Sequence, residues 1–225
     1  MKTKKVKLFD ITKLRFSIEL EVEFPNSKNS EALIGRHKVL TGWEIDSDGS
    51  LDNGAEYRPK NSNKLYWNKE TQTQLKEILA LIRVHRGKTK HTAGLHIHIN
   101  CKKFTDKQIH TIITEFVHKQ RYIIKRFRVH EERLKYTCQL LPKALLKKLK
   151  VEQISDFREG TQTTWESLGC QYLDQKHYSL NAKHLCKGGY GTLEFRLFNS
   201  TLNYKKLYEQ ILWVLTFIKE SIERE

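Results

Sequence analysis

Residues 14–24 alternate without interruption between apolar and polar side chains. The apolar positions are Leu14, Phe16, Ile18, Leu20, Val22 and Phe24, and the polar positions are Arg15, Ser17, Glu19, Glu21 and Glu23. Because neighbouring side chains of a β-strand point to opposite faces, this period of two predicts a strand with one apolar and one acidic face. Carboxylates about 7 Å apart on that face repel by roughly 2.4 kcal/mol at an effective dielectric constant of about 20. The acidic face therefore needs water, cations or a metal ion, and the solvent-exposed side of an antiparallel sheet is one interpretation.

Two further segments show the same alternation. Their polar sides carry His96, His98 and Asn100 in residues 94–100, and Glu194 and Arg196 in residues 192–197. Shorter strands are expected at 43–45, 55–58 and 178–182. Residues 46–50 have the composition of a turn, and Asn53-Gly54 is a strong hairpin signal.

Apolar residues spaced three and four apart predict the helices. We expect helices over 69–86, from 105 to about 128, over 142–150, and from about 203 to near the C-terminus. Thr105 and Gln108 have the spacing of a capping box, and Asn203 is an acceptable N-cap. Residues 152–175 show neither period, so they are expected to form an irregular insertion. Strands and helices together predict an α+β fold.

The composition narrows the class of protein. The 225 residues suit one domain, and Lys and Arg outnumber Asp and Glu by 41 to 26, a net charge of +15. Such a charge attracts polyanions such as nucleic acid or phosphates, although solubility alone also explains it. Four cysteines without a Cys-x-x-Cys pair or a signal peptide indicate free thiols in the cytoplasm. No apolar run approaches the roughly 20 residues that span a bilayer, so no membrane association is expected.

The polar faces of the three main strands suggest a common site. If these strands are neighbours, their side chains converge on a groove about 10–15 Å across. Carboxylates with imidazoles suit one or two divalent cations, Mg²⁺ or Mn²⁺, and Arg196 suits a phosphate or carboxylate. Such a set is suited to phosphoryl transfer, here without a P-loop. The alternatives are that His96 and His98 are ordinary strand residues and that Glu194 and Arg196 form a surface pair.

Six motifs, taken in order, resemble the amidoligase family of the glutamine synthetase and glutamate–cysteine ligase superfamily, which is frequent in phages and prophages. They are Phe-Ser-Ile-Glu19-Leu-Glu21, Asp48-Gly-Ser, Gly-Ala-Glu56, Gly-Leu-His96-Ile-His98, Tyr178-Ser-Leu-Asn181 and Thr-Leu-Glu194-Phe-Arg196. The resemblance covers about residues 14–202. It implies one glutamine synthetase-like catalytic domain over 1–225, with a helical insertion around 105–150. The implied fold is a curved, mainly antiparallel sheet around an ATP site, with helices on its outer face.

The resemblance also implies an activity, which is ATP-dependent formation of an amide or peptide bond through an acyl-phosphate. By this resemblance one Mg²⁺ would bind Glu19, His96 and Glu194, and a second would bind Glu21 and Glu56. Contacts to ATP or the acyl-phosphate would come from His98, Arg196 and Asn181. Asp48 would lie near the incoming amine. Glu23 could replace a ligand in either metal set. The chain departs from the usual family pattern at Ser17, where Gly is usual, and at Arg58, where Ser precedes the proline. It also has Lys176 and His177 where an Arg is common.

The expected partners are a carboxylate-bearing substrate and an amine donor. The basic helix from residue 105 and the segment 142–150 suggest an acidic acceptor, such as a polyglutamyl peptide, a peptidoglycan precursor, another acidic polymer or a nucleic acid. A solvated helix face explains the same basic residues. A host-cell cytoplasm is expected if the chain is phage-encoded. Two alternative functions remain: a metal-dependent nuclease that uses Glu19, Glu21, His96 and His98, and an inactive basic module that binds nucleic acid.

Overall fold

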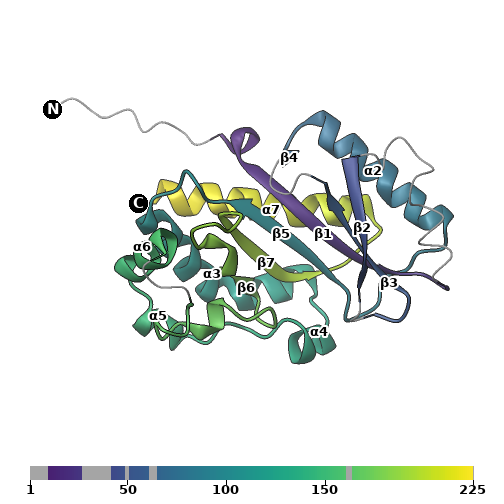
Figure 1. Ribbon diagram of the computed structural model, residues 1–225. Helices are drawn as coiled ribbons and strands as arrows, with labels where there is room; N and C mark the ends of the chain where they lie inside the picture. The colour runs from purple at the N-terminus through teal and green to yellow at the C-terminus, as the bar shows by residue number, and fades with distance from the viewer. Residues whose placement is uncertain (1–9, 27–41, 49–50, 61–64, 161–163, 225) are drawn as a thin grey trace.

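The chain folds around one antiparallel sheet (Figure 1). A computed structural model describes residues 10–26, 42–48, 51–60, 65–160 and 164–224. Its strands are β1 (Arg15–Glu23), β2 (Trp43–Asp48), β3 (Gly54–Pro59), β4 (Leu65–Tyr66), β5 (Gly94–Asn100), β6 (Leu180–Asn181) and β7 (Thr192–Asn199). Its helices are α2 (Lys69–Val84), α3 (Asp106–Phe127), α4 (Glu131–Tyr136), α5 (Leu145–Lys148), α6 (Val151–Glu159) and α7 (Tyr204–Glu223), with 3₁₀ turns at Ile11–Lys13, Gln171–Leu173 and Lys183–Leu185. These elements confirm the predicted α+β class.

The strand order is β2-β3-β1-β5-β7-β6, and β4 pairs with the beginning of β1. Every strand pair in the sheet is antiparallel. The three strands with the strongest alternation in the sequence, β1, β5 and β7, are therefore adjacent at the centre of the sheet. This confirms the condition for a common site, which was that these three strands are neighbours in one sheet.

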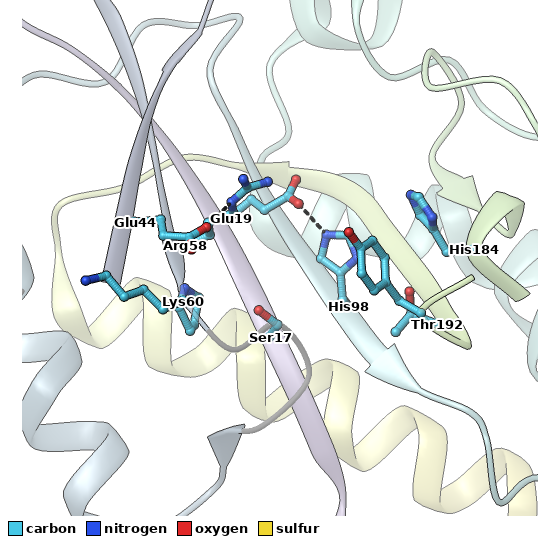
Figure 2. A pocket seen from close by; sticks show the side chains of 10 residues that line it. Ser17, Glu19, Glu44, Arg58, Lys60, His98, His184 and Thr192 are labelled. Atoms are coloured by element: carbon cyan, nitrogen blue, oxygen red, sulfur yellow. Dashed lines mark hydrogen bonds and ion pairs between the residues drawn. The ribbon is translucent and has the colours of Figure 1, made fainter. Parts of the chain in front are cut away.

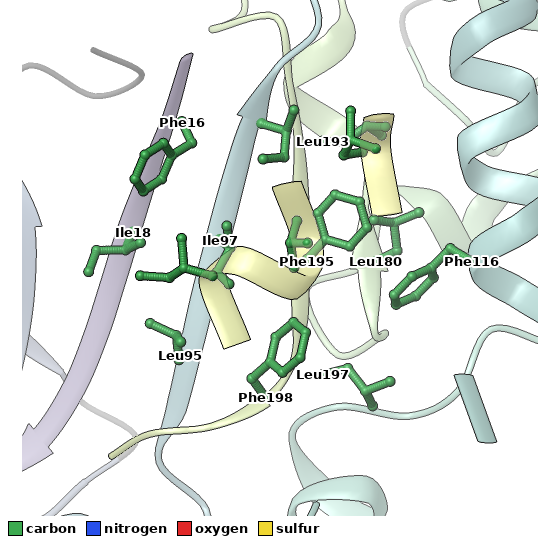
Figure 3. Close-up of a cluster of buried hydrophobic side chains, with 14 of the residues drawn as sticks. Phe16, Ile18, Leu95, Ile97, Phe116, Leu180, Leu193, Phe195, Leu197 and Phe198 are labelled. Atoms are coloured by element: carbon green, nitrogen blue, oxygen red, sulfur yellow. The ribbon is translucent and has the colours of Figure 1, made fainter. Parts of the chain in front are cut away.

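The apolar face of the sheet packs against helices. All apolar positions of β1 are buried, which confirms the alternation predicted for this segment. In Figure 3, Ile18, Ile97 and Phe195 come from β1, β5 and β7 and lie in one layer. The ring of Phe195 meets Phe116 of α3 edge to face at 5.2 Å between centroids, and lies 6.1 Å from Phe217 of α7. Burying large apolar groups on one face leaves the other face of the same strands for polar chemistry.

The long helices begin where the sequence predicts. Thr105 and Gln108 form the reciprocal hydrogen bonds of a capping box at the start of α3. The side chains of Asn68 and Asn203 cap α2 and α7. These caps satisfy backbone N–H groups that have no partner inside the helix.

Several described segments differ from the sequence expectation. Strand β2 continues through residues 46–48, where a turn was expected, and the strand expected over 178–182 is limited to Leu180–Asn181. The helix expected over 142–150 is reduced to the four residues of α5, preceded by turns. The segment expected to be irregular, 152–175, begins inside the helix α6. That helix has only two buried residues, Ile154 and Phe157, too few for a visible period, and it is held by packing against α3. Tertiary contacts thus override a weak local pattern.

The cysteines are free thiols, as expected. Burial raises the pKa of Cys101 to about 12 and that of Cys138 to about 11, so both stay protonated at neutral pH. In the part of the chain that the structure describes, no helix combines the length and the apolar character that a membrane span requires.

Candidate functional site

The polar side of β1, β5 and β7 brings the predicted residues together. Glu19 of β1 stands opposite His96 of β5 in the strand register, and His98 stands opposite Glu194 of β7. Residues directly opposite on neighbouring strands have Cβ atoms about 4.5–5.5 Å apart. Side chains 77 and 96 positions apart in the chain therefore meet because of strand pairing alone.

His96 lies at the centre of the carboxylates. Its Nδ1 is 2.9 Å from Oε2 of Glu19 and 3.5 Å from Oε1 of Glu194. Its Nε2 is 3.1 Å from Oε1 of Glu21. One imidazole thus contacts three carboxylates from two neighbouring strands.

His98 and Arg196 flank this centre. Nε2 of His98 is 3.0 Å from Oε1 of Glu19, the contact drawn in Figure 2. Arg196 pairs with Glu194 through its Nη1. Among the described residues, Glu19, His98 and Glu194 form the group whose ligand atoms all lie within 4.8 Å of one another, close enough to hold one metal ion.

The centre of the polar face is buried, so the interpretation as a solvent-exposed sheet face is wrong there. Glu21 is 8% exposed, His96 3% and Glu194 5%. The pair of Glu194 and Arg196 is accordingly not a surface ion pair, because its side chains are 7% and 14% exposed. Charges taken out of water need close partners, and here carboxylates and cationic groups supply them for each other.

The pKa shifts follow from this mixture of burial and close charge. Burial alone would raise the pKa of Glu19, but the hydrogen bond with His96 and the close positive charge of His98 outweigh it and hold the pKa well below its usual range. Burial lowers the pKa of His98, and the negative charge of Glu19, whose Oε1 is 3.0 Å from Nε2 of His98, reverses this to a net increase. Burial raises the pKa of Glu194, but Arg196 and the two histidines lower it overall. These shifts therefore favour the ionised forms of Glu19 and Glu194.

Two buried nitrogen atoms test whether the site suits a cation. Nε2 of His96 and Nε2 of His98 lie 3.1 Å and 3.0 Å from carboxylate oxygens, yet neither makes a hydrogen bond of acceptable geometry. Buried polar atoms normally have such a bond. Imidazole nitrogens and carboxylate oxygens are ligands that Mg²⁺, Mn²⁺ and Zn²⁺ accept, with the oxygen-rich set favouring Mg²⁺ or Mn²⁺. The donor set fits a divalent cation.

The other predicted residues surround this centre at different distances. Glu56 of β3 stands opposite Glu21 in the register, so it shares the same side of the sheet. Asn181 of β6 stands opposite Glu194, and its Oδ1 accepts a hydrogen bond from the backbone of Lys183. The backbone of Asp48 ends β2, while its side chain lies outside the described part. Glu23 binds Lys90 at 2.5 Å, at the far end of β1.

A pocket of about 490 Å³ opens beside Glu19 and His98 (Figure 2). Its lining is Ser17, Glu19, Glu44, Arg58, Pro59, Lys60, His98, His184, Tyr190 and Thr192. Arg58 is held by Glu44 at 3.3 Å and by Asp46 at 2.5 Å, and these carboxylates with Glu56 raise its pKa although burial lowers it. A volume of this size is typical of small-molecule sites.

Sequence reasoning missed a buried arginine beside the site. Arg133 of α4 is 1% exposed, and its Nη1 is 3.9 Å from Oε2 of Glu21. Arg133 stands among charged residues, in Glu-Glu-Arg133-Leu-Lys, so no periodicity marks this residue as buried. The lining residue His184 was also missed, because it lies in the short 3₁₀ turn Lys183–Leu185, which has no strand or helix period.

A comparison with protein families agrees with this geometry. Residues 12–218 match the family described as "Putative amidoligase enzyme". The comparison with curated proteins finds no match. The matched range includes all seven strands and the whole candidate site, and leaves out only the two ends of the chain. The chain therefore belongs to the amidoligase family.

Proposed function

We propose that the protein is an ATP-dependent carboxylate–amine ligase that forms an amide or peptide bond through an acyl-phosphate. The observation that carries this proposal is the partly buried group of Glu19, His98 and Glu194 with Arg196 beside it, on one face of the central strands. Membership of the amidoligase family supports the same reaction class. The free thiols fit a cytoplasmic location, where ATP is abundant.

The proposed reaction has two steps. An oxygen of the substrate carboxylate forms a bond to the terminal phosphorus of ATP, and the bond from that phosphorus to ADP breaks. The nitrogen of a neutral amine then bonds to the acyl carbon, phosphate leaves, and the amine proton passes to phosphate or water. Bound Mg²⁺ would neutralise charge on the phosphates.

Different residues of the site would bind the cations and the phosphates. Glu19 and Glu194 would hold one cation, with one of the two histidines as the third ligand. The resemblance favours His96 in that role, whereas the distances favour His98. Glu21 and Glu56 would hold a second cation. The histidine that does not bind metal, together with Arg196 and Asn181, would contact the phosphates, because a guanidinium matches phosphate geometry.

The pocket beside the site is our proposed place for the carboxylate substrate. Arg58 and Lys60 supply positive charge on one wall, and Glu44 supplies a carboxylate next to them. An acidic amino acid or peptide would be attracted to such a wall. Asp48, whose backbone ends the neighbouring strand β2, keeps its proposed place near the incoming amine.

Binding and trapping experiments test the proposal. Calorimetry should detect ATP binding that requires Mg²⁺ and is lost in Glu21→Ala and Glu194→Ala but kept in Glu44→Ala, a carboxylate on the pocket wall. With hydroxylamine as the amine and a set of acidic amino acids and peptides as substrates, an acyl-phosphate would be trapped as a hydroxamate. Absence of ATP binding in the unaltered protein, or equal binding in all variants, would refute the proposal. Plasmid DNA incubated with Mg²⁺ should stay intact, and cleavage would favour a nuclease instead.

A further inference from the structure

We infer that Arg133 is a positioning residue, which holds Glu21 so that only one of its carboxylate oxygens is available to the site. Arg133 lies in α4, in the helical segment between β5 and β6, and it is 1% exposed. A fully buried guanidinium in a short helix whose other charged residues are exposed requires compensating partners. Those partners lie in the strands of the site.

The guanidinium first joins two backbone segments. Its Nη1 donates to the carbonyl oxygen of Thr92 at 2.7 Å, just before β5, and its Nη2 donates to that of Arg196 at 2.6 Å, in β7. Strand β6 pairs with β7 at Phe195 and Glu194, so the backbone carbonyl of Arg196 lies outside the paired residues, and Arg133 supplies its donor. The planar fork of an arginine can satisfy two carbonyls at once in a fixed direction, which a lysine cannot do.

Gly94 fits beneath this fork. A Cβ atom at position 94 would lie 2.1 Å from Nη2 of Arg133 and 2.5 Å from its Cζ, so no side chain can be accommodated while the guanidinium stays in place. The backbone N–H of Gly94 donates to Oε2 of Glu21. The absence of a side chain thus lets the backbone, the guanidinium and the carboxylate approach one another.

The two oxygens of Glu21 consequently have different surroundings. Oε2 accepts from Gly94 and lies 3.9 Å from Nη1 of Arg133, whereas Oε1 faces Nε2 of His96 at 3.1 Å. The hydroxyl of Ser200 also donates to the backbone oxygen of Glu21 at 2.5 Å. Oε2 is therefore engaged by the protein, and Oε1 is directed to the centre of the site.

This arrangement gives the helical segment a role in the site. Without the guanidinium, Glu21 loses the positive charge on its Oε2 side, and its carboxylate can rotate toward the centre with both oxygens. In the proposed function Glu21 binds the second cation, so the inference about that cation rests on the proposed function. The positioning of the carboxylate itself does not.

A first experiment measures the positioning without any metal. Selective ¹⁵N labelling of glycine gives at most 11 amide signals, and Gly94→Ala identifies the signal of Gly94 by its loss. Hydrogen bonding to a carboxylate shifts an amide proton to higher frequency, so Arg133→Lys and Glu21→Gln should each move the Gly94 signal to lower frequency. Lys135→Met, which removes an exposed charge from the same helix, should leave it unchanged. A Gly94 signal that moves in Glu21→Gln but not in Arg133→Lys would overturn the inference.

A second experiment measures cation binding in the folded variants. Titration of the intact protein with Mn²⁺, followed by electron paramagnetic resonance, should give weaker binding of the second ion by about tenfold in Arg133→Lys, which is within the range for outer partners of metal ligands. Lys135→Met should match the unaltered protein within about twofold. Wild-type Mn²⁺ affinities in a folded Arg133→Lys variant would overturn the inference.

The two experiments separate two kinds of failure. If the unaltered protein binds no Mn²⁺, the proposed function fails, while the Gly94 signal still decides whether Arg133 positions Glu21. If Arg133→Lys does not fold, Gly94→Ala perturbs the same fork from the other side and should weaken the second Mn²⁺ equally. Full Mn²⁺ binding by folded Gly94→Ala would contradict the inference.

Discussion

The centre and the edge of the polar sheet face carry the same residue types in different surroundings. At the centre, Glu194 and Arg196 of β7 have side-chain exposures of 7% and 14%. At the edge, Asp46 of β2 and Arg58 of β3 have exposures of 52% and 39%. Both are carboxylate–guanidinium pairs on the same side of one sheet. The comparison shows that the burial of a pair, and not its residue types, decides how strongly its charges depend on each other.

The physical reason is the screening of charge by water. A pair near the surface interacts through a high effective dielectric constant and is stabilised by about 1 kcal/mol or less. A buried pair has lost its hydration, so removing one partner leaves an uncompensated charge in the interior. We expect four experiments to separate the centre from the edge, with effects that decrease in the following order.

The largest effect is expected on stability when a guanidinium is removed. Arg196→Met leaves Glu194 buried without its closest cation and should lower the free energy of unfolding by about 3–5 kcal/mol. Arg58→Met should lower it by less than about 1 kcal/mol, because the pair is half exposed. Urea denaturation without added metal measures both values. Equal losses in the two variants would show that burial does not distinguish the two pairs.

The next effect concerns catalysis and cation binding. Glu194→Gln keeps the size of the side chain but removes a proposed metal ligand. Mutation of residues that only hydrogen-bond to a metal ligand already lowers metal affinity or activity by about 10- to 100-fold. For a ligand itself we therefore expect at least about a 100-fold loss of activity and a loss of Mn²⁺ affinity. The matched change at the edge, Glu44→Gln, should reduce activity only slightly. Steady-state kinetics and Mn²⁺ titration test the difference, and a fully active Glu194→Gln would exclude this ligand.

The dependence of stability on pH should come from the centre. The pKa of Glu19 is lowered by folding, so its contribution is present above its unfolded value of about 4.3 and is lost as pH falls through the folded value. The pKa of His98 is raised, so its contribution is complete below its unfolded value of about 6.5 and is lost as pH rises through the folded value. Both contributions are present together between about pH 4.3 and 6.5.

Thermal unfolding across pH checks this window in the metal-free protein. His98→Gln should remove the part of the decline above about pH 6.5 that His98 causes. His118→Gln, a change at an exposed position of α3, should leave the profile unaltered. Strands β2 and β3, which carry the pair of Asp46 and Arg58, contain no histidine, so they add nothing to the profile near neutral pH. An unchanged profile in His98→Gln would contradict the pairing with Glu19.

The smallest effect is expected for substrate binding at the edge. Arg58→Met should raise the KM for the carboxylate substrate by no more than about tenfold, which corresponds to about 1.4 kcal/mol. The kcat should change little, because Arg58 lines the pocket wall and is paired with Glu44 and Asp46. Steady-state kinetics with the substrate found by hydroxamate trapping measures both constants. A large fall in kcat with constant KM would place Arg58 in the chemistry instead.

Much of this architecture was predictable from the sequence. The alternation in residues 14–24 predicted β1 and the face on which Glu19 and Glu21 lie, since a period of two admits no other regular structure. The capping residues Thr105 and Asn203 located the starts of α3 and α7, because helix caps are local interactions. Such features depend on neighbours in the chain and can be read from it.

Other features depended on contacts between distant segments. Periodicity could not tell that the acidic face would be buried, because burial depends on which strands and loops lie beside it. Nor could it reveal that Arg133 lies beside Glu21, since a helical arginine has the same local sequence pattern whether its guanidinium contacts water or a carboxylate. The sequence by itself determined which side chains share a face of each strand. Only the tertiary structure decided which faces meet and which charges lose their water, because both depend on contacts between residues far apart in the chain.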